Sequence, residues 1–405
     1  MKICVLTRTT SEHCVGGMED HIRTLYTGLA KAGIKVHIIT TGHPKGIESK
    51  TSDGIEYFFI KNAAGSAYTF NWWRGSIKKF VELHKKNRYD LIHSQSMGAY
   101  ELAKRDLPKK LGLPFVSSFH GTPFDEYRTS LNLIKEKKGR FSKFDELIAR
   151  ANFAHRNYWL KKVSTSSDAV IATSNEQARI MDEVYGVSRN KIKVVFNGMN
   201  LDEFTPGMDT DNLRIKLQLA KEDKVLLCIA RLEPDKGVQF VIDTMPELIK
   251  RGNKIKLVIV GDGSLRRMLE NKVKEYGISD NVIFTGYVKF SDLPKYMDLA
   301  DIFVNYTIRQ NGYDLTMLEA MACETPVVAS HIGSHPTLIK NGGNGFMVPL
   351  WDINNLVDTL HKVIENKALM RNIGKNARET VLSDFSDSAM VKGTIKVFES
   401  LVNRG

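Results

Sequence analysis

Residues 301–330 read DIFVNYTIRQNGYDLTMLEAMACETPVVAS, and this stretch decides the fold that the sequence predicts. Two apolar runs, 301–304 and 326–329, are typical of short buried strands. Between them lie a polar loop and a helix-forming segment, 315–323. A loop and helix N-terminus after a strand is where an open α/β sheet binds ligands, phosphates in particular. Glu319 lies about one turn into this helix, so its carboxylate can face the same crevice. A buried helix with one solvated Glu is the alternative.

The N-terminal half opens with the same order of elements. An apolar strand over 2–7 leads through Gly16 and Gly17 into a helix over 18–31, whose apolar residues have helical spacing. A second strand follows over 35–41. This order begins a doubly wound α/β fold, and paired glycines let the backbone approach a ligand closely. A tight turn that binds nothing is the alternative.

The pattern of strands and helices continues and divides the chain in two. Further strands are expected at 90–93, 114–119, 169–173, 193–197, 224–230, 254–260, 281–285 and 345–348. His120 directly follows one of these strands and is predicted to point into a crevice, unless it only caps local backbone. The polar segment 200–223 reads as a linker. We therefore expect two doubly wound domains, one over 1–203 and one over 204–385.

Charge and cysteine content limit the class of protein. The 405 residues include 58 Lys and Arg against 46 Asp and Glu, a net charge of +12 that favours anionic partners. No zinc-finger, RNP-like or basic-zipper pattern is present, so nucleic acid is not expected. The four cysteines are scattered, which predicts reduced thiols and no metal site. The opening MKICVLT reads as a strand and no apolar run approaches the ~20 residues of a membrane span, so we expect a cytoplasmic protein.

Two segments of the N-terminal half are rich in basic residues and also contain aromatic residues. Residues 71–88 hold Trp72 and Trp73 among several Lys and Arg, and 135–162 is equally basic. Basic helices with aromatic residues can lie on an anionic membrane surface. A peripheral position at the inner membrane face is therefore one prediction. A docking surface for a soluble anionic acceptor and a plain solvated face are the alternatives.

Cations and glycines follow successive strands of the C-terminal half. Arg231 and Lys236 flank a loop at the start of a helix, which suits a diphosphate. Gly261 and Gly263 follow the next strand, and Glu319 accepts hydrogen bonds as a ribose diol requires. Together they predict a nucleoside diphosphate in this half. The alternative is that these residues bind no ligand, with the two cations in salt bridges within the loop and Glu319 at the surface.

Several stretches resemble a known family. ARLEPDKGVQFVIDTM (230–245), KLVIVGDGSLRRMLE (256–270), NVIFTGYV (281–288) and LEAMACETPVVAS (318–330) resemble the C-terminal domain of glycosyltransferase family 4. GGMEDHIRTLYTGLAKAGIKVHIIT and SSFHGTP are similar to the family's N-terminal glycine loop and His-bearing loop. The last helix, about 386–405, resembles the family helix that returns to the N-terminal domain.

The resemblance implies the GT-B fold, with two Rossmann-like, doubly wound domains facing an interdomain cleft, and closure of the domains to assemble the site. It implies a retaining transfer of sugar from a nucleotide diphosphate-sugar to an acceptor hydroxyl, without a metal or a separate cofactor, because the nucleotide-sugar is a co-substrate. UDP-hexose or UDP-N-acetylhexosamine is favoured, and GDP-mannose is the rival. The acceptor is a small molecule, a glycan or a lipid-linked species.

The same resemblance assigns roles to residues. Arg231 and Lys236 are expected to hold the diphosphate and stabilise the departing nucleotide, Glu319 to bind the ribose, and His120 to touch the donor sugar. These four form the expected catalytic set. The other expected donor-binding residues are Gly16, Gly17, Gly261, Gly263, Gly286, Tyr287, Val288, Asn311, Gly312, Tyr313, Asp314 and Leu315. Of these, 286–288 are expected beside the base.

The sequence departs from the family pattern in three places: at 311, at 314, and at 333–337, where the usual Gly-Gly followed by Pro-Glu is Gly333-Ser334 followed by Pro336-Thr337. The first Glu of the motif that pairs two Glu eight positions apart is replaced by Asn311, and Asp314 stands where Gly is usual. Asn keeps hydrogen bonding but loses the charge, and Asp314 moves a carboxylate by three positions. A non-catalytic GT-B nucleotide-binding protein is therefore one alternative, and a membrane-associated binding module is another.

Overall fold

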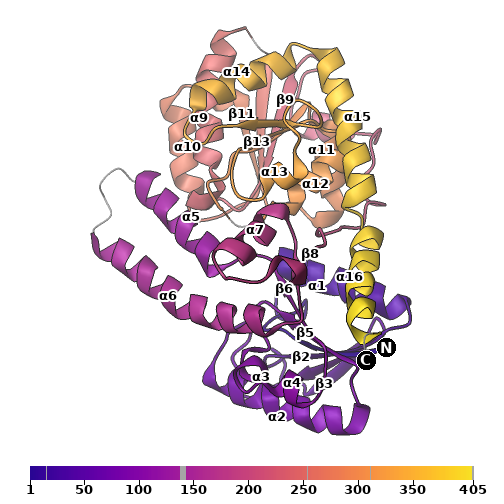
Figure 1. Ribbon diagram of the computed structural model, residues 1–405. Coiled ribbons are helices and arrows are strands. Elements are labelled where there is room, and N and C mark those ends of the chain that lie inside the picture. The colour runs from indigo at the N-terminus through magenta and orange to yellow at the C-terminus, as the bar shows by residue number, and fades with distance from the viewer. Residues whose placement is uncertain (15, 137–142, 253, 311, 404–405) are drawn as a thin grey trace. The chain divides into compact units, whose positions relative to one another are not determined.

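The chain forms two compact units, each built on one sheet (Figure 1). The computed structural model describes residues 1–14, 16–136, 143–252, 254–310 and 312–403. Unit 1 comprises Met1–Tyr127, Leu147–Met199 and Phe385–Gly405. Unit 2 comprises Arg128–Glu146 and Asn200–Asp384.

Unit 1 contains an eight-stranded sheet in the order β3-β4-β2-β1-β5-β6-β7-β8. Its strands are β1 Lys2–Leu6, β2 Lys35–Thr40, β3 Ser49–Ser52, β4 Ile55–Phe59, β5 Leu91–Gln95, β6 Phe115–Phe119, β7 Ala169–Ala172 and β8 Ile192–Val194. All neighbours pair in parallel except β3 and β4. Parallel pairing explains the near-continuous apolar runs, because helices must cover both faces of such a sheet.

The helices associated with unit 1 come between and after these strands. They are α1 Gly17–Lys31, α2 Phe70–Asn87, α3 Tyr100–Lys104, α4 Leu107–Lys110, α5 Pro123–Glu136, α6 Lys143–Ser166, α7 Asn175–Glu183, the 3₁₀ turn η1 Arg189–Lys191 and α16 Asp387–Val402. Helix α7 has a side-chain cap at its N-terminus, since Ser174 Oγ accepts a hydrogen bond from Gln177 N at 3.0 Å. From Arg128 onward, α5 belongs to unit 2.

Strand β1 shows why both faces of the unit 1 sheet are apolar. Ile3 and Val5 belong to a core that includes residues of α1 and α16, whereas Cys4 and Leu6 belong to a second core with α2, α6 and α7. Side chains of a strand alternate between faces, so one apolar run supplies both cores. The C-terminal helix thus completes one core of unit 1, where Phe398 is fully buried.

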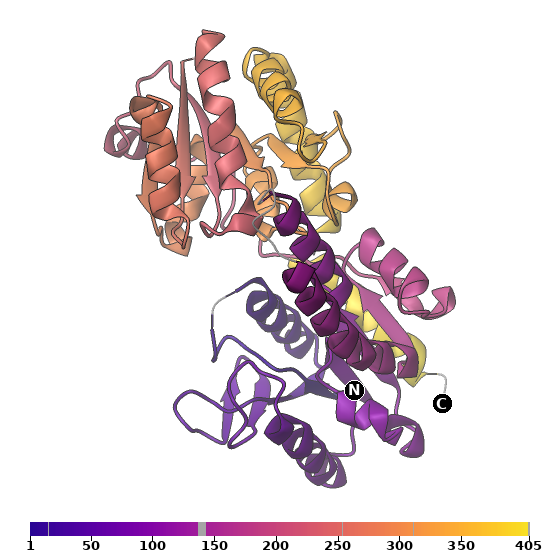
Figure 2. The same cartoon turned by 90° about the vertical axis from the view of Figure 1, so that its left-hand side faces the viewer.

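Unit 2 contains a six-stranded parallel sheet in the order β11-β10-β9-β12-β13-β14. Its strands are β9 Lys224–Ile229, β10 Ile255–Val260, β11 Val282–Gly286, β12 Ile302–Asn305, β13 Val327–Ser330 and β14 Phe346–Val348. Figure 2 shows helices on both sides of this sheet. The helices are α8 Asp211–Lys216, α9 Val238–Lys250, α10 Arg266–Glu275, α11 Leu293–Leu299, α12 Leu315–Ala322, α13 His335–Leu338, α14 Ile353–Ile364 and α15 Lys367–Asp384, with 3₁₀ turns η2 Pro234–Lys236, η3 Ser279–Asn281 and η4 Phe290–Asp292.

The predicted α/β class is confirmed, and the bounds of the predicted strands agree with the observed ones to within three residues. The sequence analysis did not anticipate the β3–β4 hairpin. Its first strand reads SKTS, is largely exposed and pairs only with β4, so it carries no apolar alternation. The basic segment 135–162 is also not one element: it includes the end of α5 and most of α6, and 137–142 lie outside the described residues.

We predict that Phe398→Ala lowers the free energy of unfolding by about 3–5 kcal/mol, because it opens a cavity in the core shared with α1. Urea unfolding followed by circular dichroism measures the change. Leu382→Ala on α15 is the control, since Leu382 is exposed. Equal destabilisation by the two substitutions would contradict the assignment of α16 to the core of unit 1.

Candidate functional site

The carboxyl edge of the unit 2 sheet has one switch point, between β9 and β12. From β9 the chain winds outward through β10 to β11, and from β12 it winds the other way through β13 to β14. Loops that leave two such strands diverge, and the crevice between them is where doubly wound sheets bind ligands. The two loops here are 230–237 after β9 and 306–314 after β12, which contain the predicted cations and the predicted sugar-side residues.

The two loops are fastened together by backbone contacts. The carbonyl of Asp235 accepts hydrogen bonds from Ile308 N at 3.0 Å and from Thr307 Oγ1 at 2.7 Å. Gly237 has φ +67°, and a Cβ there would lie 1.9 Å from the Tyr306 carbonyl oxygen. Only glycine fits such a position. The loop that carries Lys236 is therefore held in a fixed place at the head of the switch point.

Lys236 and Asp314, 78 residues apart, form an ion pair across the switch point. The distance from Lys236 Nζ to Asp314 Oδ1 is 2.6 Å, and Asp314 Oδ2 accepts a hydrogen bond from Asn305 Nδ2 at 3.1 Å. The Lys236 side chain is only 9% exposed. Burial alone would raise the pKa of Asp314, but the Lys236 ammonium and the Asn305 amide lower that pKa well below its usual range. Asp314 is thus a carboxylate at neutral pH.

Arg231 lies on the same loop with its side chain exposed, and within the described ranges its guanidinium has no hydrogen bond or ion pair.

The neighbouring glycines allow close packing of the strand ends. A Cβ at Gly261 would lie 2.0 Å from the Ala230 carbonyl oxygen, and one at Gly263 would lie 2.6 Å from that of Leu232. They hold the Arg231 loop against the end of β10, and a side chain at either position would prevent this contact.

The remaining predicted residues of unit 2 lie at the same edge with different exposure. Glu319 is buried at 6% exposure within α12, and Tyr313 is buried beside the start of that helix. Tyr287 follows β11 and is 83% exposed, and Gly286 and Val288 flank it with partial exposure. Gly312 has φ +69°, and Leu315 is the first residue of α12. Asn311 lies outside the described residues.

Helix α5 supplies two contacts that the sequence analysis missed. Asn132 Nδ2 donates to the Ile308 carbonyl at 2.8 Å, and Thr129 Oγ1 accepts from Gln310 N at 2.9 Å. In each bond the partner of the α5 side chain is a backbone group of the loop after β12, so α5 helps to fix that loop. No sequence signal identifies these residues, because their partners are about 180 positions away in the chain.

In unit 1, Gly16 and Gly17 lie where α1 begins. Gly16 is the N-cap and offers no side chain to the first turn. The nearby Glu19 is buried and accepts hydrogen bonds from Thr9 Oγ1 at 2.8 Å and Cys14 Sγ at 3.4 Å. A Cβ at Gly16 would lie 2.7 Å from Glu19 Oε2. The sequence analysis overlooked Glu19, although an acidic residue in a helix's first turn was a readable signal.

His120 ends a chain of uncharged hydrogen bonds at the carboxyl edge of the unit 1 sheet. Its Nε2 donates to Gln95 Oε1 at 2.7 Å, and Gln95 Nε2 donates to Tyr26 OH at 2.7 Å. The Tyr26 hydroxyl is 2.9 Å from His93 Nδ1, and His93 Nε2 is 2.7 Å from Ser118 Oγ. Gln95 and Tyr26, which the sequence analysis did not select, therefore fix the ring of His120.

Burial keeps the histidines of this network neutral. It lowers the pKa of His120 to about 4, opposed by a hydrogen bond with Asn197, and it lowers that of His93 to about 3. The ring of His21 lies 4.2 Å from that of His120 and contacts it edge-on. Burial, and then the neighbouring His120, lower the pKa of His21 well below its usual value. His120 is thus a neutral hydrogen-bonding group at physiological pH and not an imidazolium.

Comparison with known proteins agrees with this arrangement. Residues 15–203 match the family described as Glycosyltransferase Family 4, and residues 209–380 match that described as Glycosyl transferases group 1. The chain belongs to glycosyltransferase family 4. It is a glycosyltransferase of the GT-B fold that uses nucleotide-sugar donors, so the predicted family, fold and enzyme class are confirmed.

Individual relatives of this family 4 enzyme span most of its length. An uncharacterised glycosyltransferase of Methanocaldococcus jannaschii is 27% identical over 98% of this chain and 98% of its own length. The alpha-monoglucosyldiacylglycerol synthase of Streptococcus pneumoniae is 28% identical over 78% of this chain and 68% of its own. The crystal structure of Anabaena HepE in complex with UDP and glucose matches with a TM-score of 0.71 and 20% identity, covering 99% of this chain and 100% of that one.

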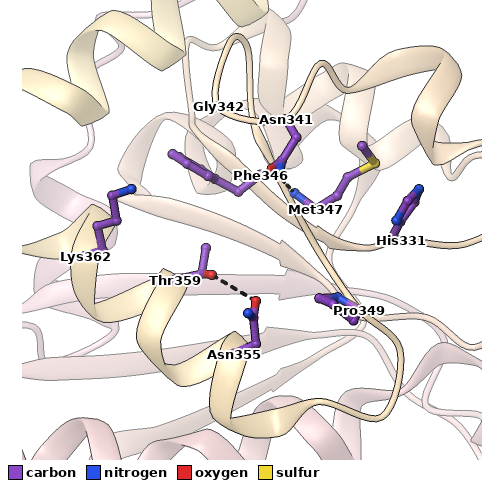
Figure 3. Close-up of a pocket in the computed structure, with 9 residues that line it drawn as sticks. All are labelled: His331, Asn341, Gly342, Phe346, Met347, Pro349, Asn355, Thr359 and Lys362. Atoms are coloured by element: carbon purple, nitrogen blue, oxygen red, sulfur yellow. Dashed lines mark hydrogen bonds between the residues drawn. The ribbon is translucent and has the colours of Figure 1, made fainter.

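The enzyme also has a hollow of about 520 Å³ that includes none of the predicted site residues. It lies in unit 2 between the edge strand β14 and helix α14 (Figure 3). Phe346, Met347, Asn355, Thr359 and Lys362 are among its lining residues, and no carboxylate lines it. It therefore offers no acid–base pair. Among the described residues, no group of three or more His, Cys, Asp or Glu is placed to hold a metal ion.

We predict that His120→Gln weakens the pH dependence of stability between pH 6.5 and 4. The unfolded chain binds a proton at His120 in this range and the folded chain does not, so the parent enzyme loses stability as pH falls from about 6.5 towards about 4. The Gln side chain does not titrate, so the variant should lose on the order of 2–3 kcal/mol less of its free energy of unfolding over this pH range.

Urea unfolding of both proteins at pH 7, 6, 5 and 4 measures the difference, with the exposed His331→Gln as the control. Parallel pH profiles for parent and His120→Gln would show that His120 takes up its proton in the folded state.

Proposed function

We propose that this enzyme transfers a sugar, with retention of the anomeric configuration, from a nucleoside diphosphate-sugar to an acceptor hydroxyl. The observation that carries the proposal is the buried Lys236 ammonium at the switch point of unit 2, on the same loop as the exposed Arg231. One held cation and one exposed cation on the same loop at the head of a doubly wound sheet suit a diphosphate.

The proposal assigns the nucleotide to unit 2. Arg231 and Lys236 hold the diphosphate, and the start of α12 adds N–H groups and the positive end of its dipole. Glu319 accepts from the ribose, and the residues from Gly286 to Val288 lie beside the base. These groups supply fixed positive charge where negative charge develops on the leaving diphosphate, worth several kcal/mol in such sites.

The proposal assigns to His120 a neutral contact with the donor sugar. Because Nε2 is used by Gln95, the group that the ring can still turn to a ligand is its Nδ1 side, next to Asn197. The bond between the anomeric carbon and the phosphate oxygen breaks as the acceptor oxygen attacks from the same face. The acceptor proton passes to the departing phosphate oxygen, so no residue of the chain has to change its protonation state.

For the donor we propose UDP-hexose or UDP-N-acetylhexosamine, with GDP-mannose as the rival. The support is the bound UDP and glucose in the similar HepE structure. The substitution of Asn311 for the usual Glu keeps one alternative in view, a protein that binds nucleotide without transfer. Asn311→Glu tests that alternative: a large gain in donor hydrolysis or transfer over the parent would support it, and loss of an existing activity would oppose it.

We further propose that the acceptor is lipid-linked and reached at an anionic membrane, on its cytoplasmic face. Unit 1 has an exposed apolar surface on α6, formed by Leu147, Ile148 and Tyr158, with exposures of 62%, 44% and 61%. The C-terminal half of α6 adjoins the start of α2, because the ring centroids of Trp159 and Trp73 are 5.3 Å apart. Exposed basic residues near these helices include Arg74, Lys78, Lys104 and Lys161.

Two other observations bear on this acceptor proposal. The printed name of the Streptococcus pneumoniae relative describes a diacylglycerol glycolipid synthase. Within the described part of the chain, no helix is both long and apolar enough to cross a membrane. Contact through a basic surface with a few inserted apolar side chains is the mode that fits such a surface.

We predict that one of UDP, GDP and ADP, or a sugar derivative of one of them, stabilises the parent and does not stabilise Lys236→Met. A ligand at 100 times its Kd adds about 2.7 kcal/mol to the free energy of unfolding. A thermal-shift screen measures this. Lys224→Met, which removes a lysine of another Asp–Lys pair in unit 2, is the control. No stabilisation of the parent by any nucleotide would overturn the donor site.

We predict that the enzyme binds vesicles containing phosphatidylglycerol and that replacing Leu147, Ile148 and Tyr158 by Ser weakens binding at least tenfold. Vesicle flotation in low and high salt measures this, and binding should fall with salt. A matched triple variant replaces Ile215, Met268 and Leu382, which are exposed apolar residues of unit 2. Equal losses in both variants, or equal binding to neutral vesicles, would contradict the proposed surface.

A further inference from the structure

The carboxylate of Asp314 is placed in an unusual way for its position. Asp314 is the N-cap residue of α12, where an Asp normally accepts a hydrogen bond from the first turn of the helix. Here the side chain makes no such bond. Its two oxygens go instead to Lys236 Nζ at 2.6 Å and to Asn305 Nδ2 at 3.1 Å. The first turn of α12 is left without a side-chain cap, and Lys236 already has an anionic partner.

A second ion pair in unit 2 shows what a purely structural pair looks like on the same two strands. Lys224, the first residue of β9, lies 2.8 Å from Asp301, which directly precedes β12. The other oxygen of Asp301 accepts from Val225 N at 2.8 Å, so that carboxylate also fixes backbone. This pair is at the amino ends of the strands, away from the switch-point loops. The carboxylate of Asp314, at the carboxyl ends, bonds to two side chains and to no backbone group among the described residues.

We propose that Asp314 is a resident counter-ion of Lys236 that a nucleoside diphosphate displaces, so that Asp314 limits the affinity of this site for its nucleotide. The inference rests on the proposed function, which assigns the diphosphate to Lys236. A buried ammonium needs an anion at all times. In the empty site the Asp314 carboxylate fills that need, and in the occupied site the phosphate takes its place while Asn305 retains a hydrogen bond to Asp314.

The exchange has two consequences for the site. The diphosphate forms an ion pair with Lys236 only by breaking the Lys236–Asp314 pair. The net gain in binding free energy is therefore smaller than the attraction between the ammonium and the diphosphate alone. The diphosphate must also approach a carboxylate of its own sign. Both effects weaken nucleotide binding, and both speed release of the nucleoside diphosphate after transfer. Arg231, which has no ion pair within the described ranges, is not subject to this competition.

The test compares nucleotide affinity in matched variants by isothermal titration with UDP, GDP and ADP. Asp314→Asn keeps the hydrogen bond to Asn305 and removes the charge. We expect it to tighten the Kd of the nucleotide that the parent binds about tenfold. Asp301→Asn, which breaks the structural pair, should leave the Kd within twofold of the parent. Asp314→Glu should behave like the parent.

A double variant keeps the test valid if Asp314→Asn folds poorly. Asp314→Asn with Lys236→Met removes both charges, so no ammonium is left unpaired in the folded state. We expect this protein to fold and to bind the nucleotide more weakly than the parent. Thermal unfolding of each variant without nucleotide establishes that it is folded before the titration.

The outcomes separate this inference from the proposed function. If the parent binds none of the three nucleotides, the donor site itself is wrong. If the parent binds and Asp314→Asn binds equally or more weakly, Asp314 does not compete with the nucleotide and the inference is overturned. If Asp314→Asn leaves nucleotide affinity unchanged but weakens the corresponding nucleotide-sugar, Asp314 reads the sugar and the inference is likewise overturned.

Discussion

A single charged group, the ammonium of Lys236, imposes much of the order at the carboxyl edge of unit 2. It is nearly buried, and a buried charge is tolerated only with a partner of opposite sign and well-placed hydrogen bonds. Asp314 provides the charge and Asn305 fixes Asp314. The loops that bring these residues together need a glycine at 237, where a Cβ would strike the Tyr306 carbonyl, and they need the Asp235 carbonyl to hold the loop after β12. The topology makes this possible, because β9 and β12 are neighbours whose loops diverge.

The carboxyl edge of the unit 1 sheet differs from that of unit 2, because its buried histidines are uncharged. His120, His93 and His21 are buried without carboxylate partners among the described hydrogen bonds, and burial keeps them uncharged. Gln95 and Tyr26 connect two of the rings through neutral hydrogen bonds and determine which ring nitrogen of His120 carries its proton. A sugar presents hydroxyl groups, which bind well to neutral donors and acceptors, whereas a diphosphate needs cations. The two edges therefore have the electrostatic character that the two ends of a nucleotide-sugar would require.

The sequence was sufficient for the periodic and local parts of this structure. Apolar runs predicted the buried strands, helical spacing predicted α1, and helix-forming residues predicted α12. Residues next to strand ends, such as Lys236 and His120, could be selected because strand ends share one edge. Contacts between distant segments could not be predicted. Lys236 and Asp314 were both noted, but nothing local indicated that they pair. Asn132 reaches a loop 176 positions away, and the exposed SKTS strand has no apolar pattern. Gly261 and Gly263 were selected as ligand residues, but nothing local in the sequence indicated that a Cβ at either position would strike the β9 loop.

The Lys236–Asp314 pair also bears on how a transferase balances binding against turnover. An interaction that holds the donor, the transition state and the product diphosphate equally well lowers KM without raising kcat, and it slows product release. A bare buried ammonium would act in this way, because it would attract every diphosphate state strongly. A carboxylate that competes for the ammonium weakens all ground states, while the extra negative charge that develops on the leaving oxygen still gains from the nearby Arg231 and the N-terminus of α12. The presence of Asp314 where the family usually has Gly is then compatible with an active enzyme. Asp314 reduces nucleotide affinity, but the difference in negative charge on the leaving oxygen between the ground state and the transition state, on which transfer depends, is preserved.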